Sequence, residues 1–489
     1  MDRRRFVRTV GKGSAALALS LHAGRLFGQQ PPPPQYPVDC SPPAHGQPKR
    51  ITFDTTIDVT PRKSVWDLSA GELDRLRAAY AALRDLAAKD PSDPRGWMQQ
   101  ANVHCFNCSG GFDPSNVEIH GSWWFMPWHR CYLHVHERIL ANLIGDPSFR
   151  LAYWDWDTYP GHATLPPPYV PAGQSLYDVY RGVSATDVLP RRIVGPTAMS
   201  IVLGTQSTDA FMGQLSNPSQ GQYYPGAMEN SPHGPVHIWT GYPGNPGQPN
   251  EPAGCFYPNT EGGPAVDQSS NGCMDMGVLA SAARDPIFFA HHSNIDRLWD
   301  VWNGMPASQG NPKSTDWTDQ RFTFYDQNGD WVYISIADVI GTNEQANLRY
   351  AYQQPQSAPA AATAFLAAAK AAPRARRTTG VRTLTPLTVH AAATPTPVGT
   401  TPHIRTIALP DAHQENLRRF AAAGGTSQRR YYLHIEGLTL PAHESTIVDV
   451  FIGDVDPATV TEHGPSFVGT FSVVASGRHA NHHEVVRNA

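Results

Sequence analysis

The sequence predicts a mainly α-helical domain, built as a four-helix bundle with long loops, followed by a C-terminal β-sandwich domain. Two observations support this prediction. Between residues 69 and 302, four stretches have helical patterning or spacing, and three of them contain histidines. From His403 onward, apolar and polar residues alternate instead, which is the period of a half-buried strand.

The first predicted helix covers residues 69–88. Ser69 is a suitable N-cap, and Glu72 stands at the third helical position, which together predict a capping box. The helix has one apolar stripe, made of Leu73, Leu76, Tyr80 and Leu83.

The other three helices are predicted over 127–144, around 233–237 and over 285–302. Proline opens the first of these and Gly145 follows its end, which is the usual asymmetry of helix termini. Histidines on all three helices would face inward, so a metal-binding bundle is the natural architecture.

Two further stretches complete the organisation. Residues 321–336 alternate on both sides of Asn328-Gly329, which predicts a β-hairpin. Residues 354–400 are dominated by Ala, Pro, Thr and Arg and are predicted to be a linker that proteases cut easily. The predicted β-sandwich occupies 401–489.

The N-terminus has the pattern of a twin-arginine export signal. Arg3, Arg4 and Arg5 precede Phe6, and a short apolar run covers 15–21. We therefore expect residues 1–30 to be a signal peptide and the mature protein to be periplasmic or extracellular. The alternative is a disordered basic tail. The run is too short to span a membrane, and the mature form is expected to have no membrane segment.

Charge excludes one class of partner. The formal net charge is −4 and only 16% of residues are charged, so no basic face is expected to recruit nucleic acid or anionic lipid. The oligomeric state is left open.

The histidines fall into two sets. His233 and His237 stand four residues apart, so both imidazoles lie on one face of a helix, and His291 and His292 follow in the fourth helix. The second set lies upstream and comprises His104, His120 and His129. The alternative is histidines that are merely exposed or hydrogen-bonded, but two sets of three, each in an aromatic context, favour two metal sites.

Imidazole alone does not identify the metal, since zinc, copper, iron and nickel all accept it. No Asp or Glu falls at ligand spacing within the clusters, which disfavours a di-zinc hydrolase and favours copper. With these motifs the chain resembles the type 3 copper proteins, namely tyrosinases, catechol oxidases and hemocyanins. It is most similar to plant-type polyphenol oxidases and their bacterial relatives over about residues 36–345.

The resemblance implies two copper ions in a binuclear site. His104, His120 and His129 would bind the first, and His233, His237 and His292 would bind the second. Helical periodicity cannot choose between His291 and His292, whereas the family motif points to the second of the pair. The implied substrates are phenolic small molecules and O2.

The resemblance also assigns cysteines. It implies a thioether between Cys108 and His120, against the alternative of a buried thiol, and a disulfide between Cys40 and Cys105. Cys255 and Cys273 enclose a Gly-rich loop and could pair, although spacing does not fix connectivity.

Three residues bear on substrate range. In the family, an acid at the position of Glu229 holds a water beside the copper ions and helps to remove the phenol proton. Gly234 replaces the Asn of many monophenol-hydroxylating relatives, and Leu279 replaces a Phe of plant relatives above the second copper. These two departures have opposite implications for monophenol activity.

The C-terminal domain resembles the shielding domain of latent plant-type enzymes, with a passive stabilising domain as the alternative. We therefore expect a di-copper phenol oxidase that converts o-diphenols to o-quinones and also hydroxylates monophenols. The closest rivals are a catechol oxidase and an o-aminophenol oxidase. A rival of another class is an oxygen carrier. The natural substrate is left open.

Overall fold

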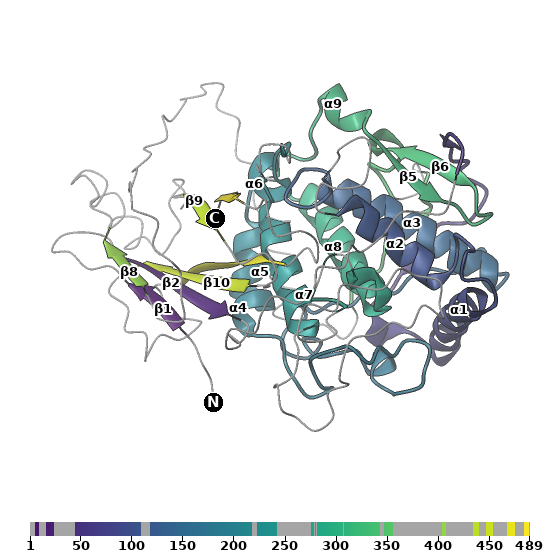
Figure 1. Cartoon of the computed structure of the whole chain (residues 1–489), viewed down its shortest axis with the longest axis horizontal. Helices are drawn as coiled ribbons and strands as arrows, with labels where there is room; N and C mark the ends of the chain where they lie inside the picture. The colour runs from purple at the N-terminus through teal and green to yellow at the C-terminus, as the bar shows by residue number, and fades with distance from the viewer. Residues whose placement is uncertain are drawn as a thin grey trace, which may run out of the picture.

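The computed structural model describes a continuous helical domain and several separate strands. It covers residues 5–8, 16–23, 45–108, 118–217, 223–241, 275–277, 279, 281–306, 308–342 and 347–355, and in the C-terminal region 403–406, 434–439, 446–452, 467–474 and 484–488. Figure 1 shows the helices gathered in one body, with a sheet set against one side of it.

Four long helices make the centre of the body: α1 (Ala70–Lys89), α2 (Trp97–Asn107), α3 (Phe125–Leu143) and α8 (Ile287–Asn303). Helix α3 packs against α8 and α1, and α1 packs against α2. The predicted capping box at α1 is confirmed, since Ser69 and Glu72 bond each other's backbone N–H. The prediction of a mainly helical domain is therefore confirmed, although the sequence did not reveal α2.

The segment predicted as the third helix is interrupted. A π-helical turn, η4 (Glu229–His233), precedes α7 (Gly234–Thr240), and Ser231 inside the turn has extended backbone, with φ −162° and ψ 123°. His233 and His237 still stand on one side of α7, with ring centroids 4.5 Å apart.

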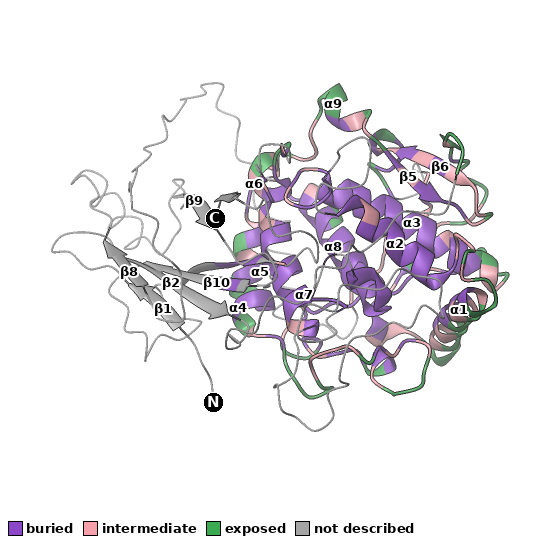
Figure 2. Ribbon diagram, in the orientation of Figure 1, coloured by how far each residue is buried: buried purple, intermediate pink, exposed green. Residues whose placement is uncertain are grey.

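Shorter helices surround this centre. They are η1 (Val65–Asp67), η2 (Pro167–Tyr169), α4 (Arg191–Val194), α5 (Pro196–Leu203), α6 (Thr208–Met212), η6 (Ala282–Arg284), α9 (Thr315–Thr318) and η7 (Ile336–Asp338). Figure 2 shows that α3, α7 and α8 are buried almost throughout, whereas α1 and α9 expose one side.

Two small sheets flank the helices. The predicted hairpin is confirmed as β5 (Arg321–Tyr325) and β6 (Trp331–Ser335), and β3 (Lys49–Arg50) adds to β6 in parallel. The second sheet pairs β4 (Thr60–Arg62) with β7 (Tyr350–Tyr352), also in parallel.

A buried ionic network joins this second sheet to the bundle. Arg62 Nε donates to Glu137 at 2.9 Å, and both side chains are fully buried. Asp296 accepts hydrogen bonds from Arg130 and from the hydroxyls of Tyr350 and Tyr352, each at 2.5 Å. These contacts therefore tie the sheet of β4 and β7 to helices α3 and α8.

The C-terminal region contains β8 (His403–Thr406), β9 (His434–Thr439), β10 (Thr446–Ile452), β11 (Phe467–Val473) and β12 (Glu484–Asn488). Strands β9 and β12 pair with each other, while β8, β10 and β11 share a sheet with β1 (Arg5–Arg8) and β2 (Ala16–Ala23) in the order β1-β8-β2-β10-β11. The β-sandwich itself and the role of residues 1–30 as a signal stay predictions. Among the described helices, none is long and apolar enough to cross a membrane.

Candidate metal centre

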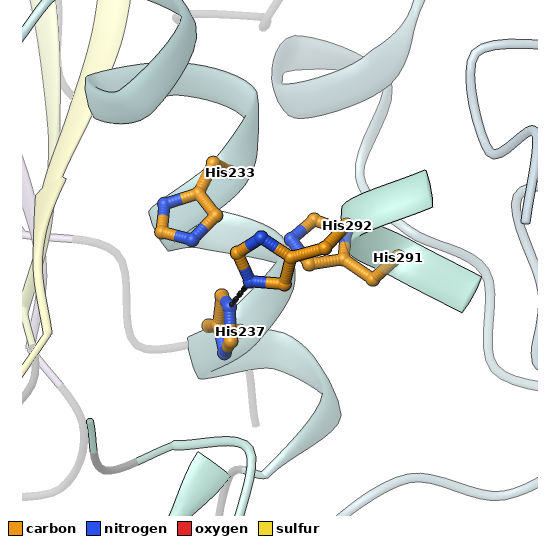
Figure 3. Close-up of side chains that lie close together, drawn as sticks. All are labelled: His233, His237, His291 and His292. Carbon is orange, nitrogen blue, oxygen red and sulfur yellow. Dashed lines mark hydrogen bonds between the residues drawn. The ribbon is translucent and has the colours of Figure 1, made fainter. Parts of the chain in front are cut away.

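Two groups of buried side chains meet in the middle of the bundle. One is His233, His237, His291 and His292, and the other is His104, Cys108 and His120; within each group one potential ligand atom per residue lies within 4.8 Å of all the others. Figure 3 shows the first group, in which α7 and α8 direct their imidazoles at each other. The structure therefore brings together the two histidine sets that the sequence predicted.

His129 completes the upstream set. It comes from the first turns of α3, and its ring centroid lies 5.6 Å from that of His104 and 5.3 Å from that of His120. All three imidazoles are buried. The upstream set is thus compact enough for its three imidazoles to converge on one ion.

Backbone carbonyls orient two of the rings. His129 Nδ1 lies 2.7 Å from the Phe125 carbonyl oxygen, and His237 Nδ1 lies 2.8 Å from that of Met276. A carbonyl only accepts, so each Nδ1 carries the proton and each Nε2 presents a lone pair to the centre. This arrangement is typical of metal-binding histidines, whose second nitrogen is held by a hydrogen bond.

Burial also keeps these rings neutral. It lowers the pKa of His129 to about 3 and that of His237 to about 4, although the carbonyl contacts oppose the shift. Burial likewise lowers the pKa values of His104, His120, His233 and His292 well below the usual value. A neutral imidazole is the form that binds a metal ion.

Several buried ring nitrogens have no hydrogen-bond partner among the described residues. In the two groups and His129 they are both nitrogens of His120 and of His233, Nε2 of His129, Nε2 of His291 and Nδ1 of His292, and outside them Nδ1 of His134 and of His136. Leaving a buried polar group unsatisfied costs about 1–3 kcal/mol, so a cluster of them is unfavourable unless something binds there. Imidazole donors without carboxylates suit copper or zinc rather than magnesium or calcium.

The two adjacent histidines of α8 differ in their hydrogen-bond partners. Trp156 Nε1 donates to His291 Nδ1 at 3.0 Å, and an indole N–H can only donate. The neutral ring of His291 therefore carries its proton on Nε2 in this arrangement. His292 Nε2 instead faces His237 Nε2 at 3.1 Å, as the dashed line in Figure 3 shows.

The acid at position 229 connects the two groups. Glu229 begins the turn that carries His233, and its Oε1 accepts the N–H of Gly121, next to His120, at 2.6 Å. The carboxylate is thus held between the two histidine sets, where the sequence predicted a catalytic acid.

A second acid, which the sequence analysis did not identify, lies beside it. Glu118 Oε1 accepts the backbone N–H of His120 at 2.9 Å and lies 3.8 Å from His120 Nδ1. The sequence offered one indication of this role, because Glu118 stands two residues before the predicted ligand His120. Two buried carboxylates therefore hold the N–H groups of consecutive residues in the loop before α3.

Of the remaining predicted site residues, Leu279 is buried and its carbonyl lies 3.8 Å from Cys108 Sγ. The Cys108 thiol is 3.3 Å from His104 Nδ1. Cys105 is disulfide-bonded, and its partner lies outside the described residues, as do Cys40, Cys255 and Cys273. Gly234 follows His233 directly and opens α7.

Comparison with known proteins gives consistent matches. The model of the common central domain of tyrosinase matches residues 94–200 and 186–305, and the model of the polyphenol oxidase middle domain matches 311–362. The latent form of a chloroplastic polyphenol oxidase from Prunus armeniaca is 34% identical over 348 residues, which are 66% of this chain and 53% of that protein. The chain thus spans about half the length of this curated relative.

Two solved structures extend the likeness to the fold. The polyphenol oxidase of Vitis vinifera (Grenache) aligns with a TM-score of 0.53 and 29% identity, over 68% of this chain and 95% of that one. Latent apple tyrosinase aligns with a TM-score of 0.60 and 25% identity, over 88% of this chain and 89% of that one.

Proposed function

The chain belongs to the type 3 copper family of tyrosinases and polyphenol oxidases, and we propose that it is a di-copper phenol oxidase that uses O2 to oxidise o-diphenols to o-quinones. The observation that carries the proposal is the pair of converging groups of buried, neutral imidazoles with unsatisfied nitrogens. Its relatives are named as oxidases, which does not favour an oxygen carrier.

The proposed ligands are three imidazoles for each copper ion. His104, His120 and His129 hold the first, and His233, His237 and His292 hold the second. The hydrogen bond that Trp156 donates to His291, and the facing Nε2 atoms of His292 and His237, support the choice of His292. When bound, the two ions supply the exchange of electrons between phenol and O2.

The reaction balances with two catechols for each O2. Each catechol loses two electrons and two protons to become an o-quinone, and one O2 takes up four of each to become two waters. Glu229 is the proposed acceptor of the phenol proton. The N–H of Gly121, which donates to Oε1, holds this carboxylate in place.

Monophenol hydroxylation is the finer part of the proposal. It depends on how a phenol approaches Glu229, and therefore on Gly234 beside His233 and on Leu279, whose carbonyl lies near Cys108. A catechol oxidase or an o-aminophenol oxidase is the alternative. Both would turn over their substrate without general monophenol hydroxylation.

Two covalent links complete the proposed site. A thioether between Cys108 and His120 is supported by the placement of Sγ within 4.8 Å of a ring nitrogen of His120. A disulfide between Cys40 and Cys105 is supported by the disulfide state of Cys105. A bond between Cys255 and Cys273 remains an open alternative for those two residues.

We also propose that the protein is latent, with 401–489 as a shielding domain and 354–400 as the cleavable linker. Support comes from relatives named as latent forms and from the contacts of β10 and β11 with α7. For localisation we propose export or targeting directed by residues 1–30. Curated relatives are named as chloroplastic, which is compatible with a targeting segment.

Oxygen uptake by the copper-loaded protein tests the function. A monophenol and its catechol are supplied in turn, before and after limited proteolysis. Uptake with both substrates that rises after a cut in 354–400 supports a latent tyrosinase, and uptake with catechol alone supports the catechol oxidase. No uptake in any condition contradicts the phenol oxidase.

A further inference from the structure

The face of the helical domain that carries the second histidine group is covered by the C-terminal strand β11. This strand contacts η4, α7, α5 and α4. In Figure 1 the yellow strands lie against these helices. Thr470, Phe471 and Ser472 of β11 are buried.

One face of the β10–β11 pair points at the helices. Ile447 of β10 stands opposite Ser472 in the antiparallel register, and Val474 lies two residues after Ser472, so all three share one side. Ile447 belongs to the main apolar core, and Val474 packs against it. The pair is therefore seated on the helical domain through side chains, beside His233.

Gly234 is a point at which β11 meets the helices without room for a side chain. A Cβ atom at this position would lie 2.0 Å from Ser472 Oγ, 3.3 Å from Ser472 Cβ and 3.4 Å from Val474 Cγ2. The Ser472 hydroxyl is also directed at the carbonyl of Asn230, at 3.3 Å. Ser472 thus fills the space of a side chain at 234 and spans the turn that leads to His233.

The backbone does not explain the glycine. Gly234 has φ −61° and ψ −43°, which are ordinary helical values that any residue adopts. The Ser472 side chain occupies the space that a side chain at position 234 would need, and this contact accounts for a glycine there.

We propose that Gly234 is the docking notch for β11, so that a side chain at 234 and the seated strand exclude each other. The notch lies one residue from His233, and the seated strand therefore controls access to the second copper. The control of access to the second copper rests on the proposed function as a latent oxidase. The docking of β11 at Gly234 does not depend on copper chemistry.

The test measures hydrogen exchange of the β11 amides in the copper-loaded full chain. Gly234→Asn should make these amides exchange about tenfold faster, since overpacking opens the contact. Gly234→Ala should have a smaller but measurable effect, because its single methyl group overlaps Ser472 Oγ and adds nothing beyond Cβ. Gly71→Ala, at an open helical glycine with nothing within 4 Å, is the matched control and should leave β11 unchanged.

A compensating substitution distinguishes a specific clash at the docking notch from general destabilisation of the protein. Ser472→Ala removes the atom 2.0 Å from the added Cβ, so Gly234→Ala combined with Ser472→Ala should recover part of the protection that Gly234→Ala loses. Unchanged exchange in Gly234→Asn, or no recovery in the double variant, would overturn the notch.

Oxygen uptake by the uncleaved chain tests the consequence separately. Uncleaved Gly234→Asn should consume oxygen with catechol faster than the uncleaved wild type. Faster exchange without faster uptake, in a chain that is activated by proteolysis, would overturn control of access. If no form consumes oxygen, the oxidase proposal fails while the exchange result still decides the docking.

Discussion

His237 and His292 face each other with their Nε2 atoms 3.1 Å apart, although 55 residues separate them in the sequence. His237 Nδ1 donates its proton to the Met276 carbonyl oxygen. The lone pair of His237 Nε2 is therefore directed toward Nε2 of His292. This opposition of two neutral rings in a buried site is the core of the proposed second copper site.

The first prediction concerns the adjacent histidines of α8. His292→Ala should reduce the bound copper from two ions per chain to one, whereas His291→Ala should retain both because Trp156 holds the His291 ring through Nδ1. Copper content after reconstitution and gel filtration measures this. His134→Gln, a buried histidine outside both groups, is the control. Loss of one ion from His291→Ala alone would reverse the assignment.

The second prediction concerns Glu229. Glu229→Gln keeps an acceptor for the N–H of Gly121 but removes the base, so kcat for phenols should fall about 10²-fold while the copper content is unchanged. Steady-state oxygen uptake measures kcat. Unchanged turnover would exclude Glu229 as the proton acceptor.

The third prediction is the acid sensitivity of the copper-free protein. Burial holds the folded pKa of His129 at about 3 and that of His237 at about 4, below their usual value of 6.5. The folded chain therefore binds fewer protons than the unfolded one, and stability present above pH 6.5 is lost as pH falls toward these values. Glu137, with a folded pKa of about 2 against 4.5, contributes at lower pH, from about 4.5 downward.

Urea unfolding of the apoprotein at pH 7 and pH 5 tests the predicted loss of stability at lower pH. Below pH 6.5 the free energy of unfolding should fall by up to about 1.4 kcal/mol per pH unit for each such histidine. Equal unfolding midpoints at the two pH values would show that the rings are not held neutral.

The sequence predicted α1, the β5–β6 hairpin and the position of His129, because each depends on local patterns that the chain carries within a few residues. It could not choose between His291 and His292, since both are buried in α8 and the difference comes from Trp156, far away in sequence. It also missed the interruption at Ser231 and the seat of Ser472 on Gly234. Both are tertiary features without a local periodic signal.

The fourth prediction concerns the buried ion pair between β4 and α3. Glu137→Gln removes the carboxylate that Arg62 Nε contacts at 2.9 Å and leaves this buried charge with Asp296 alone, at 3.5 Å, which should lower the free energy of unfolding by about 3 kcal/mol. Lys49→Ala breaks an exposed pair with Asp330 and should cost less than about 1 kcal/mol. Chemical denaturation of both variants provides the comparison, and similar losses would refute the role of burial.

The fifth prediction concerns Cys108. If the thioether with His120 forms, a proteolytic digest should contain a cross-linked peptide pair that is lighter than the sum of the two peptides by two hydrogens. Mass spectrometry of the copper-matured protein detects it, and Cys108→Ser should lack it. Separate unmodified peptides from an active preparation would leave Cys108 as a buried thiol.

The number of copper ions that the apoprotein binds tests the central claim most directly. Anaerobic titration with Cu(I) should saturate at two ions per chain, and the loaded protein, after proteolytic activation, should then consume one O2 for every two catechols oxidised. Saturation at a single ion, or a loaded and activated protein that leaves catechol and O2 unchanged, would contradict a di-copper phenol oxidase.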